Sequence, residues 1–144
     1  MKYREIGRVG EECSQLLPIR ILVVDDFAPW RKFVSSMLVL KPEFEVVGDA
    51  SDGGKAVEKA VELKPDLVLL DINMPVLNGI EAARQIRKLV PESKIIFLSQ
   101  ESSFEIIAEA MKVGASGYVI KSMAGNQLLT AVETVLLGGT FVSD

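Results

Sequence analysis

The sequence predicts an α/β domain with a doubly wound, five-stranded parallel sheet, in the strand order 2-1-3-4-5, and helices on both faces. Short apolar runs alternate with amphipathic segments five times between residues 19 and 137. Strict alternation of strand and helix indicates a parallel sheet with right-handed crossovers. The run Leu67–Leu70 is apolar without interruption, which is typical of a strand buried on both faces. A length of 144 residues suits one such domain.

The first strand and helix follow a segment without clear periodicity. We expect residues 1–18 to be a poorly ordered extension, with a short helical piece near Glu11–Leu17. Ile19–Val24 is rich in β-branched residues and is predicted as a strand. Pro29 suits the first turn of the next helix, which Pro42 is expected to end. Residues that recur at helical spacing there are expected in the core: Trp30, Phe33, Val34, Met37 and Leu38.

The second and third units repeat this alternation. Phe44–Ala50 is predicted as the second strand and Gly53–Leu63 as the second helix. The buried run described above is the third strand. Asn78 and the glycine after it indicate a turn into the third helix, Gly79–Val90.

The last two units complete the sheet. Lys94–Leu98 is the fourth expected strand, followed by a helix over Phe104–Val113. Gly114 is expected to end that helix, as glycine often does just past a helix C-terminus. Ser116–Ile120 is the fifth strand and Ala124–Leu137 the fifth helix.

The composition excludes several classes of protein. The net charge is −4, whereas nucleic-acid-binding domains usually carry clustered Lys and Arg. The chain has no histidine, which excludes Ser–His and Cys–His catalysis and histidine metal sites. Its one cysteine, Cys13, excludes an internal disulfide. Neither a membrane-spanning run nor a signal peptide is recognisable, so we expect a cytoplasmic protein without membrane contact.

Acidic side chains follow two of the expected strands. Asp25 and Asp26 come directly after the first strand, and Asp71 comes directly after the third. In the expected strand order these strands are neighbours, and sites in open α/β sheets form at the carboxyl ends of such strands. Three carboxylates this close repel one another unless a cation is bound. Oxygen ligands alone favour Mg²⁺, or Mn²⁺ in its place.

A hydroxyl and an ammonium group are expected at the same edge of the sheet. Ser99 follows the fourth strand and Lys121 follows the fifth. Each alone has an ordinary explanation, since Ser99 suits a helix cap and Lys121 suits a solvated surface. Together with the aspartates they are typical of phosphoryl transfer, in which a cation and a lysine neutralise the transferring group. Asp71 is then expected to become an aspartyl phosphate.

Four segments carry a resemblance to a known family: Val23-Val24-Asp25-Asp26, Leu70-Asp71-Ile72-Asn73-Met74-Pro75 with Asn78-Gly79, Ile96-Phe97-Leu98-Ser99, and Gly114-Ala115-Ser116-Gly117-Tyr118-Val119-Ile120-Lys121. In these segments the chain closely resembles a response-regulator receiver domain of a two-component system, with the flavodoxin/CheY-like (βα)5 fold. The resemblance covers Ile19 to Phe141 and implies a receiver domain over residues 19–137.

The resemblance implies a phosphorylation and metal site. Asp71 would accept a phosphoryl group from the phosphohistidine of a partner sensor histidine kinase. Asp26 and Asp71 would bind Mg²⁺ directly, helped by the backbone carbonyl of Asn73. Asp25 would act partly through water.

The resemblance also implies a switch. Ser99 would turn toward the phosphoryl group, Tyr118 would swing inward behind it, and Lys121 would pair with the phosphoryl oxygens. Gln100 departs from the family, where small residues are frequent at this position, and it could crowd or gate the phosphorylation site.

Two features resemble the NarL/LuxR-type subgroup, whose members continue into a DNA-binding domain. They are Lys121-Ser122 and the ending Leu137-Gly138-Gly139-Thr140-Phe141-Val142. Residues 138–144 would then begin a linker to an effector domain that is absent from this chain. The implied output is control of transcription, with a homodimer on phosphorylation and no direct DNA binding by this chain.

Three alternative functions are compatible with parts of this pattern. An FMN-binding flavodoxin needs a phosphate loop where Asp25 and Asp26 would repel a phosphate. A haloacid-dehalogenase-like phosphatase needs a second aspartate where Asn73 stands. We therefore do not expect an enzyme beyond self-catalysed phosphorylation and dephosphorylation. The remaining alternative is an unphosphorylated pseudo-receiver that acts as a protein–protein interaction module.

Overall fold

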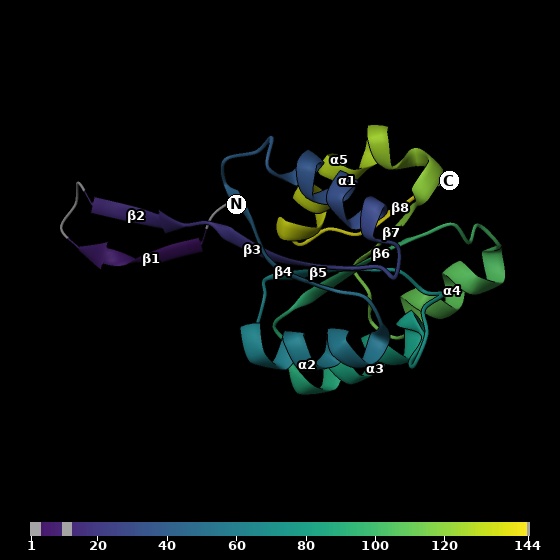
Figure 1. The fold of residues 1–144 in the computed structure, drawn as a ribbon. Coiled ribbons are helices and arrows are strands. Elements are labelled where there is room, and N and C mark those ends of the chain that lie inside the picture. Colours follow the sequence, from purple (N-terminus) through teal and green to yellow (C-terminus); the bar gives the residue numbers. More distant parts are fainter. Residues whose placement is uncertain (1–3, 10–12, 144) are drawn as a thin grey trace.

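A computed structural model describes residues 4–9 and 13–143 of the chain. A parallel sheet lies at its centre, with α1 and α5 on one face and α2, α3 and α4 on the other (Figure 1). The strands of this sheet are β3 (Ile19–Val24), β4 (Phe44–Ala50), β5 (Leu67–Leu70), β6 (Lys94–Ser99), β7 (Gly117–Ile120) and β8 (Phe141–Val142). The helices are α1 (Ala28–Leu38), α2 (Gly53–Leu63), α3 (Gly79–Leu89), α4 (Phe104–Lys112) and α5 (Ala124–Leu136), with a 3-10 turn over Lys121–Met123.

The sheet has six strands, in the order β4-β3-β5-β6-β7-β8. The first five have the expected order 2-1-3-4-5, but the expectation of a five-stranded sheet was wrong by one strand. The chain turns back after α5 at Gly138, whose φ of 97° lies in the region that glycine tolerates best. It then runs parallel to β7, pairing Gly117 with Phe141 and Tyr118 with Val142. A strand of two residues is too short to show any periodicity in the sequence.

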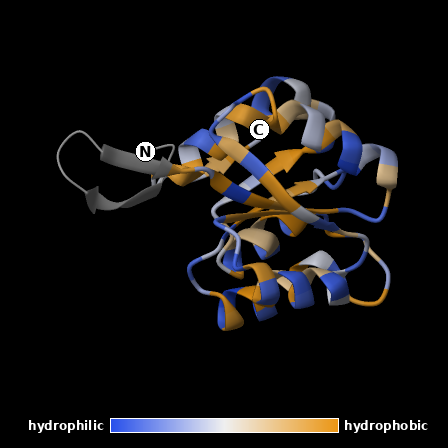
Figure 2. Cartoon of the chain, turned by 60° about the vertical axis from the view of Figure 1, so that its left-hand side comes forward, coloured by the Kyte–Doolittle hydropathy of each residue, from blue (hydrophilic) through white to orange (hydrophobic). Residues whose placement is uncertain are grey.

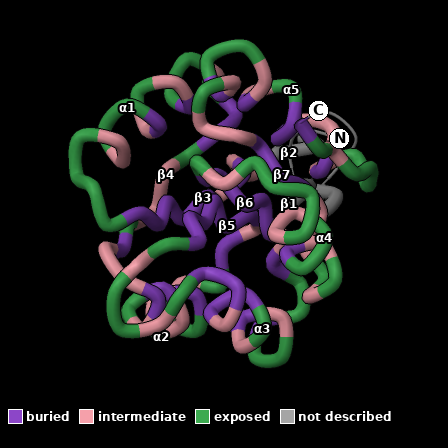
Figure 3. The backbone as a smooth tube through the Cα atoms, turned by 90° about the vertical axis from the view of Figure 1, so that its right-hand side faces the viewer, coloured by how far each residue is buried: buried purple, intermediate pink, exposed green. Residues whose placement is uncertain are grey.

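The core consists of two apolar clusters, one on each face of the sheet. The central strand β5 serves both, because successive side chains of a strand point to opposite faces. Leu67 and Leu69 join the cluster under α1 and α5, whereas Val68 and Leu70 join the cluster over α2, α3 and α4. All four are at most 1% exposed, which explains the unbroken apolar run in the sequence. Figure 2 shows the apolar strands at the centre, and Figure 3 shows that burial is concentrated there.

Side-chain caps fix where three helices begin. Asp52, Asn78 and Ser103 accept hydrogen bonds from the backbone N–H three residues further on, at the starts of α2, α3 and α4. α1 carries Pro29 in its first turn, as expected, but it ends at Leu38, before Pro42. These three helices therefore begin where local capping predicts, whereas α1 and α5 have no side-chain cap.

The N-terminal part of the described chain is an antiparallel hairpin of β1 (Arg4–Val9) and β2 (Cys13–Leu17). It is a separate two-stranded sheet that extends away from the central one (Figure 1). The helical piece expected near Glu11–Leu17 is therefore wrong from Cys13 onward, and residues 10–12 lie outside the described part. No helix among the described residues has both the length and the apolar character needed to cross a membrane.

Candidate metal and phosphoacceptor site

Two neighbouring strands bring three aspartates together at one edge of the sheet. β3 and β5 pair in parallel with Val24 opposite Leu70, so the residues after each strand lie side by side. The backbone N–H of Asp71 donates to the Val24 carbonyl over 3.1 Å, which fixes this register. One carboxylate oxygen from each of Asp25, Asp26 and Asp71 lies within 4.8 Å of the others. Such spacing suits oxygen coordination of one hard cation.

Asp25 is held rigidly and is 1% exposed. Its Oδ1 accepts a hydrogen bond of 2.9 Å from the backbone N–H of Phe27, and its carbonyl accepts one of 2.6 Å from Arg31 Nη1. Its Oδ2 has no hydrogen-bond partner but lies 2.6 Å from the ammonium of Lys121. Without good hydrogen-bond geometry this contact is mainly a charge–charge attraction, so Oδ2 keeps an orbital available for a metal ion.

Asp71 lies beside Asp25 and is 6% exposed. Its Oδ1 accepts a hydrogen bond of 2.7 Å from the backbone N–H of Ile72, and its Oδ2 accepts one of 3.2 Å from Lys121 Nζ. Burial raises the pKa of the Asp71 carboxyl, Lys121 opposes that rise, and the charge of Asp25 adds to it. The carboxylate of Asp71 is therefore not fully compensated by its neighbours.

The charges of the cluster fit a divalent cation. Three carboxylates face one ammonium, that of Lys121, which leaves two negative charges uncompensated. Asp26 is exposed and opens the cluster to solvent. A pocket of about 200 Å³ lies here, with walls formed by Asp25, Asp26, Phe27, Asp71, Asn73, Gln100 and Lys121. The residues present therefore fit Mg²⁺, which binds few carboxylates and keeps several waters.

Asn73 and Gln100 are exposed residues on the rim of this pocket. Asn73 is exposed, and its amide Nδ2 donates a hydrogen bond of 2.8 Å to Glu101 Oε2. This contact links the loop after β5 to the loop after β6, and sequence reasoning missed it because it joins residues 28 positions apart. Gln100 is exposed and lines the same pocket, and its gating role stays a prediction.

The backbone of Gly79 lies very close to that of Asp71 and sets its position. From the sequence, Gly79 is expected only to form a turn. The backbone N–H of Gly79 donates to the Ile72 carbonyl over 2.7 Å. A Cβ on Gly79 would lie 1.8 Å from the carbonyl oxygen of Asp71, so only glycine fits. The side chain of Asn78 caps α3 directly beside it. The start of α3 is thereby packed against the backbone of the expected phosphoacceptor.

The two expected switch residues bind the same residue, Glu101. Ser99, at the end of β6, is fully buried, and its Oγ accepts a hydrogen bond of 3.2 Å from the Glu101 backbone N–H. The hydroxyl of Tyr118 donates over 2.7 Å to the Glu101 carbonyl. Tyr118 is 0% exposed, so its ring lies within the core, and the inward swing that the resemblance implies stays a prediction. Burial raises the pKa of the Tyr118 phenol.

The family model for the response regulator receiver domain matches residues 21–133. The chain therefore belongs to the receiver-domain family of two-component response regulators. Within it, the chain is a NarL/LuxR-type, CheY-like receiver, since relatives of that type are among its matches. Receiver domains are generally phosphoacceptors rather than classical enzymes, and they bind Mg²⁺ at an acidic pocket.

Three relatives illustrate the match. Transcriptional regulatory protein DegU of Brevibacillus brevis is 40% identical over 124 residues, which is 86% of this chain and 52% of that protein. Chemotaxis protein CheY of Thermotoga maritima is 40% identical over 81% of this chain and 96% of its own length. A crystal structure of a LuxR-family two-component response regulator from Aurantimonas has a TM-score of 0.83 and 33% identity, and the match covers 86% of this chain and 89% of that one. The chain spans about half the length of the first relative.

Proposed function

We propose that Asp71 accepts a phosphoryl group from the phosphohistidine of a partner sensor histidine kinase, in a reaction that requires Mg²⁺ or Mn²⁺. One observation carries the proposal: the carboxylate of Asp71 lies beside both Asp25 and the ammonium of Lys121, in a pocket open to solvent. The cation would be held by Asp25, Asp26, Asp71 and the carbonyl of Asn73. When bound, it would neutralise charge on the transferring group.

The transfer uses a carboxylate oxygen of Asp71 as the nucleophile. A new bond forms between this oxygen and phosphorus while the bond from phosphorus to the imidazole nitrogen breaks. The nitrogen keeps the electron pair, and because the other ring nitrogen of the phosphohistidine carries a proton, the imidazole leaves as a neutral group. Lys121 neutralises the phosphoryl oxygens, because its ammonium already lies 3.2 Å from Asp71 Oδ2. The same groups support slow self-catalysed phosphorylation from small donors and hydrolysis of the product.

The proposed output is a change at the surface of α4, β7 and α5 that controls transcription through an effector domain, although Phe141–Val142, which were expected in a linker, form strand β8 of the sheet. Two relatives are named as transcriptional regulatory proteins, which supports a transcriptional role. Ser99 and Tyr118 would carry the change, and a homodimer on phosphorylation is one form of the output. The net charge of −4 argues against direct DNA binding by residues 1–144. We place the reaction in the cytoplasm, where ATP supplies the kinase with its phosphoryl group.

The alternative, an unphosphorylated interaction module, is less well supported. A pseudo-receiver has no need of an acidic pair or a phosphoacceptor, and this chain keeps Asp25, Asp26 and Asp71 within one cluster. A residual charge of this kind is costly for a module that never binds a cation.

Intact-mass measurement tests the proposal. After exposure to acetyl phosphate and Mg²⁺, we expect one phosphoryl adduct on the wild type and none on Asp71→Asn. Excess EDTA should abolish the adduct. An adduct that persists in Asp71→Asn would contradict the assignment of the acceptor, and full phosphorylation in EDTA would contradict the metal requirement.

A further inference from the structure

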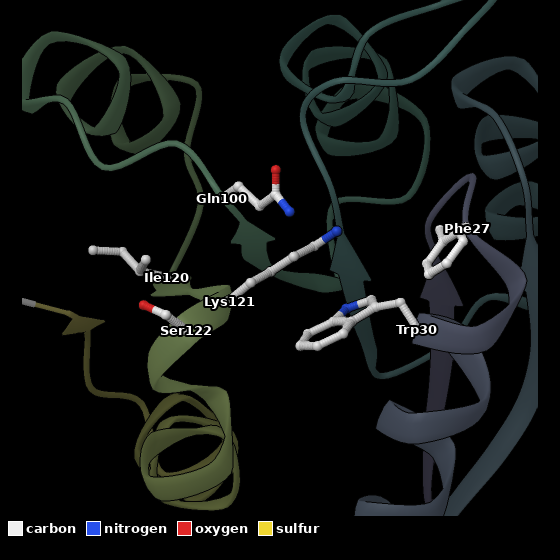
Figure 4. Close-up of a pocket in the computed structure, with 6 residues that line it drawn as sticks. All are labelled: Phe27, Trp30, Gln100, Ile120, Lys121 and Ser122. Atoms are coloured by element: carbon white, nitrogen blue, oxygen red, sulfur yellow. The ribbon is translucent and has the colours of Figure 1, made fainter.

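The sole tryptophan of the chain, Trp30, lies against the lysine of the site. Its ring centre is 5.1 Å from Lys121 Nζ, within the range of a cation–π contact. Figure 4 shows the Lys121 side chain extending from the end of β7 toward the Trp30 ring on α1, with Gln100 on its other side. The two residues are 91 positions apart in sequence, so the fold alone brings them together.

The side chain of Lys121 is only 13% exposed, but it borders a pocket that opens to solvent. Its ammonium lies 2.6 Å from Asp25 Oδ2 and 3.2 Å from Asp71 Oδ2, at the inner end of a long flexible side chain. A pocket of about 380 Å³ adjoins that side chain, and its walls are Phe27, Trp30, Gln100, Ile120, Lys121 and Ser122. Phe27 is 61% exposed and Gln100 and Ser122 are also exposed, so solvent reaches this pocket. The two ion pairs hold the ammonium only as long as both carboxylates are free to pair with it.

The ring of Trp30 is itself fixed. It packs against the apolar cluster under α1 and α5, and its centre lies 5.1 Å from that of Phe33 at an interplanar angle of 39°. Arg31, the next residue on α1, donates to the carbonyl of Asp25 over 2.6 Å and so ties the helix to the acidic cluster. The indole ring of Trp30 is therefore fixed in position on one side of the Lys121 ammonium.

We infer that Trp30 is a positioning residue for phosphoryl transfer, because its indole face holds the Lys121 ammonium beside Asp71. The inference rests on the proposed function and extends it to an uncharged residue of α1. The attraction of Asp25 for Lys121 falls when the aspartates also share a divalent cation. The indole ring is uncharged and does not compete for that cation, so it still attracts the ammonium when Asp25 is engaged.

A double-mutant cycle measures this role against simple packing. The rate of phosphorylation by saturating acetyl phosphate and Mg²⁺ is compared among the wild type, Trp30→Leu, Trp30→Phe, Lys121→Met and the double variant Trp30→Leu/Lys121→Met. We expect Trp30→Leu to lower the rate about fivefold, the typical worth of a cation–π contact, and Trp30→Phe to keep most of the rate. In the Lys121→Met background, Trp30→Leu should have little further effect.

Equal losses from Trp30→Leu in both backgrounds would overturn the inference, because they would show a packing effect independent of Lys121. An unaltered rate in Trp30→Leu would also overturn it, while the phosphoacceptor function would stand. Absence of any adduct on the wild type would instead overturn the proposed function.

A second measurement needs neither metal nor phosphodonor. In EDTA, the fluorescence emission of Trp30 reports the ammonium directly, since no other tryptophan contributes. We expect Lys121→Met to shift the emission maximum, and Lys112→Met, which removes an exposed lysine at the end of α4, to leave it unchanged. Identical emission from the wild type and Lys121→Met would overturn the contact on which the inference rests.

Discussion

Asp71 is a residue that the fold holds in an unfavourable state. Burial raises the pKa of its carboxyl above the ordinary 3.8, and Lys121 offsets this only in part. At neutral pH the charged carboxylate therefore costs folding free energy in the metal-free protein. Removing the charge should relieve that cost, because Lys121 would remain paired with Asp25 at 2.6 Å.

We predict that Asp71→Asn raises the melting temperature in EDTA at pH 7 by a few degrees, since about 1 kcal/mol corresponds to roughly 3–5 °C in a domain of this size. The gain should shrink as the pH falls through the raised pKa of Asp71 toward 3.8, because the wild-type carboxyl then becomes protonated. Thermal melts across this pH range, with Glu92→Gln on the exposed surface as a control, measure it. A gain that does not depend on pH would be inconsistent with this origin.

At the scale of an element, α3 is positioned by one close contact. The backbone of Gly79 packs against the carbonyl of Asp71, where a Cβ would come within 1.8 Å. We predict that Gly79→Ala destabilises the protein by about 3 kcal/mol and slows phosphorylation, since the loop that carries Asp71 has to move. Urea unfolding measures the first effect and acetyl phosphate labelling the second.

Gly125→Ala is the matched control for this substitution. Gly125 is also near the start of a helix, α5, but a Cβ there would meet nothing within 4 Å. The alanine should be neutral or stabilising by about 0.5–1 kcal/mol, as expected for an open helical position. If both alanines cost the same, the close approach to Asp71 does not determine the effect.

The sequence predicts the elements well where local signals are strong. The expected bounds of β3, β4, β5 and α2 agree with the structure, because periodicity and turn residues both mark them. It does not predict β8, whose two residues form a strand only because β7 offers an unpaired edge. The sequence does not predict β1 and β2 either, because these strands form by pairing with each other.

In the candidate site, too, some features could be predicted from the sequence and others could not. Strand order alone placed Asp25, Asp71 and Lys121 at one edge, and the structure brings their side chains into contact there. The ring of Trp30 was expected only in the core, yet it also covers Lys121. Its position follows from the packing of α1 against the sheet, which no local pattern specifies.

At the scale of the whole molecule, Glu101 lies between Ser99 of the candidate site and Tyr118 of the proposed output surface. Its N–H donates to Ser99 Oγ and its carbonyl accepts from the Tyr118 hydroxyl. If Ser99 turns toward a phosphoryl group, Glu101 loses one of these bonds, and the start of α4 just beyond it can shift. There Phe104 is 82% exposed, which makes it a candidate contact for a partner.

We predict that Ser99→Ala is still phosphorylated but gives a smaller conformational response. The variant lacks the hydroxyl that exchanges Glu101 for the phosphoryl group, so the two states differ less. Backbone NMR shifts along α4 and β7 measure the response. Ser102→Ala, which removes an exposed hydroxyl before α4, is the control and should respond like the wild type. A response in Ser99→Ala as large as that of the wild type would refute the coupling.

The sixth strand, β8, couples residues 141–143 mechanically to β7. Ser143 is 4% exposed, its N–H donates over 2.9 Å to the carbonyl of Tyr118, and its Oγ accepts over 3.1 Å from the Ile120 N–H while also bonding Gln127. Each such hydrogen bond contributes about 1 kcal/mol net, so residues 141–143 can detach from the sheet by breaking one bond after another. A force on Ser143 therefore acts first on its hydrogen bonds to β7. Conversely, a shift of β7 weakens the attachment of Ser143 to the sheet.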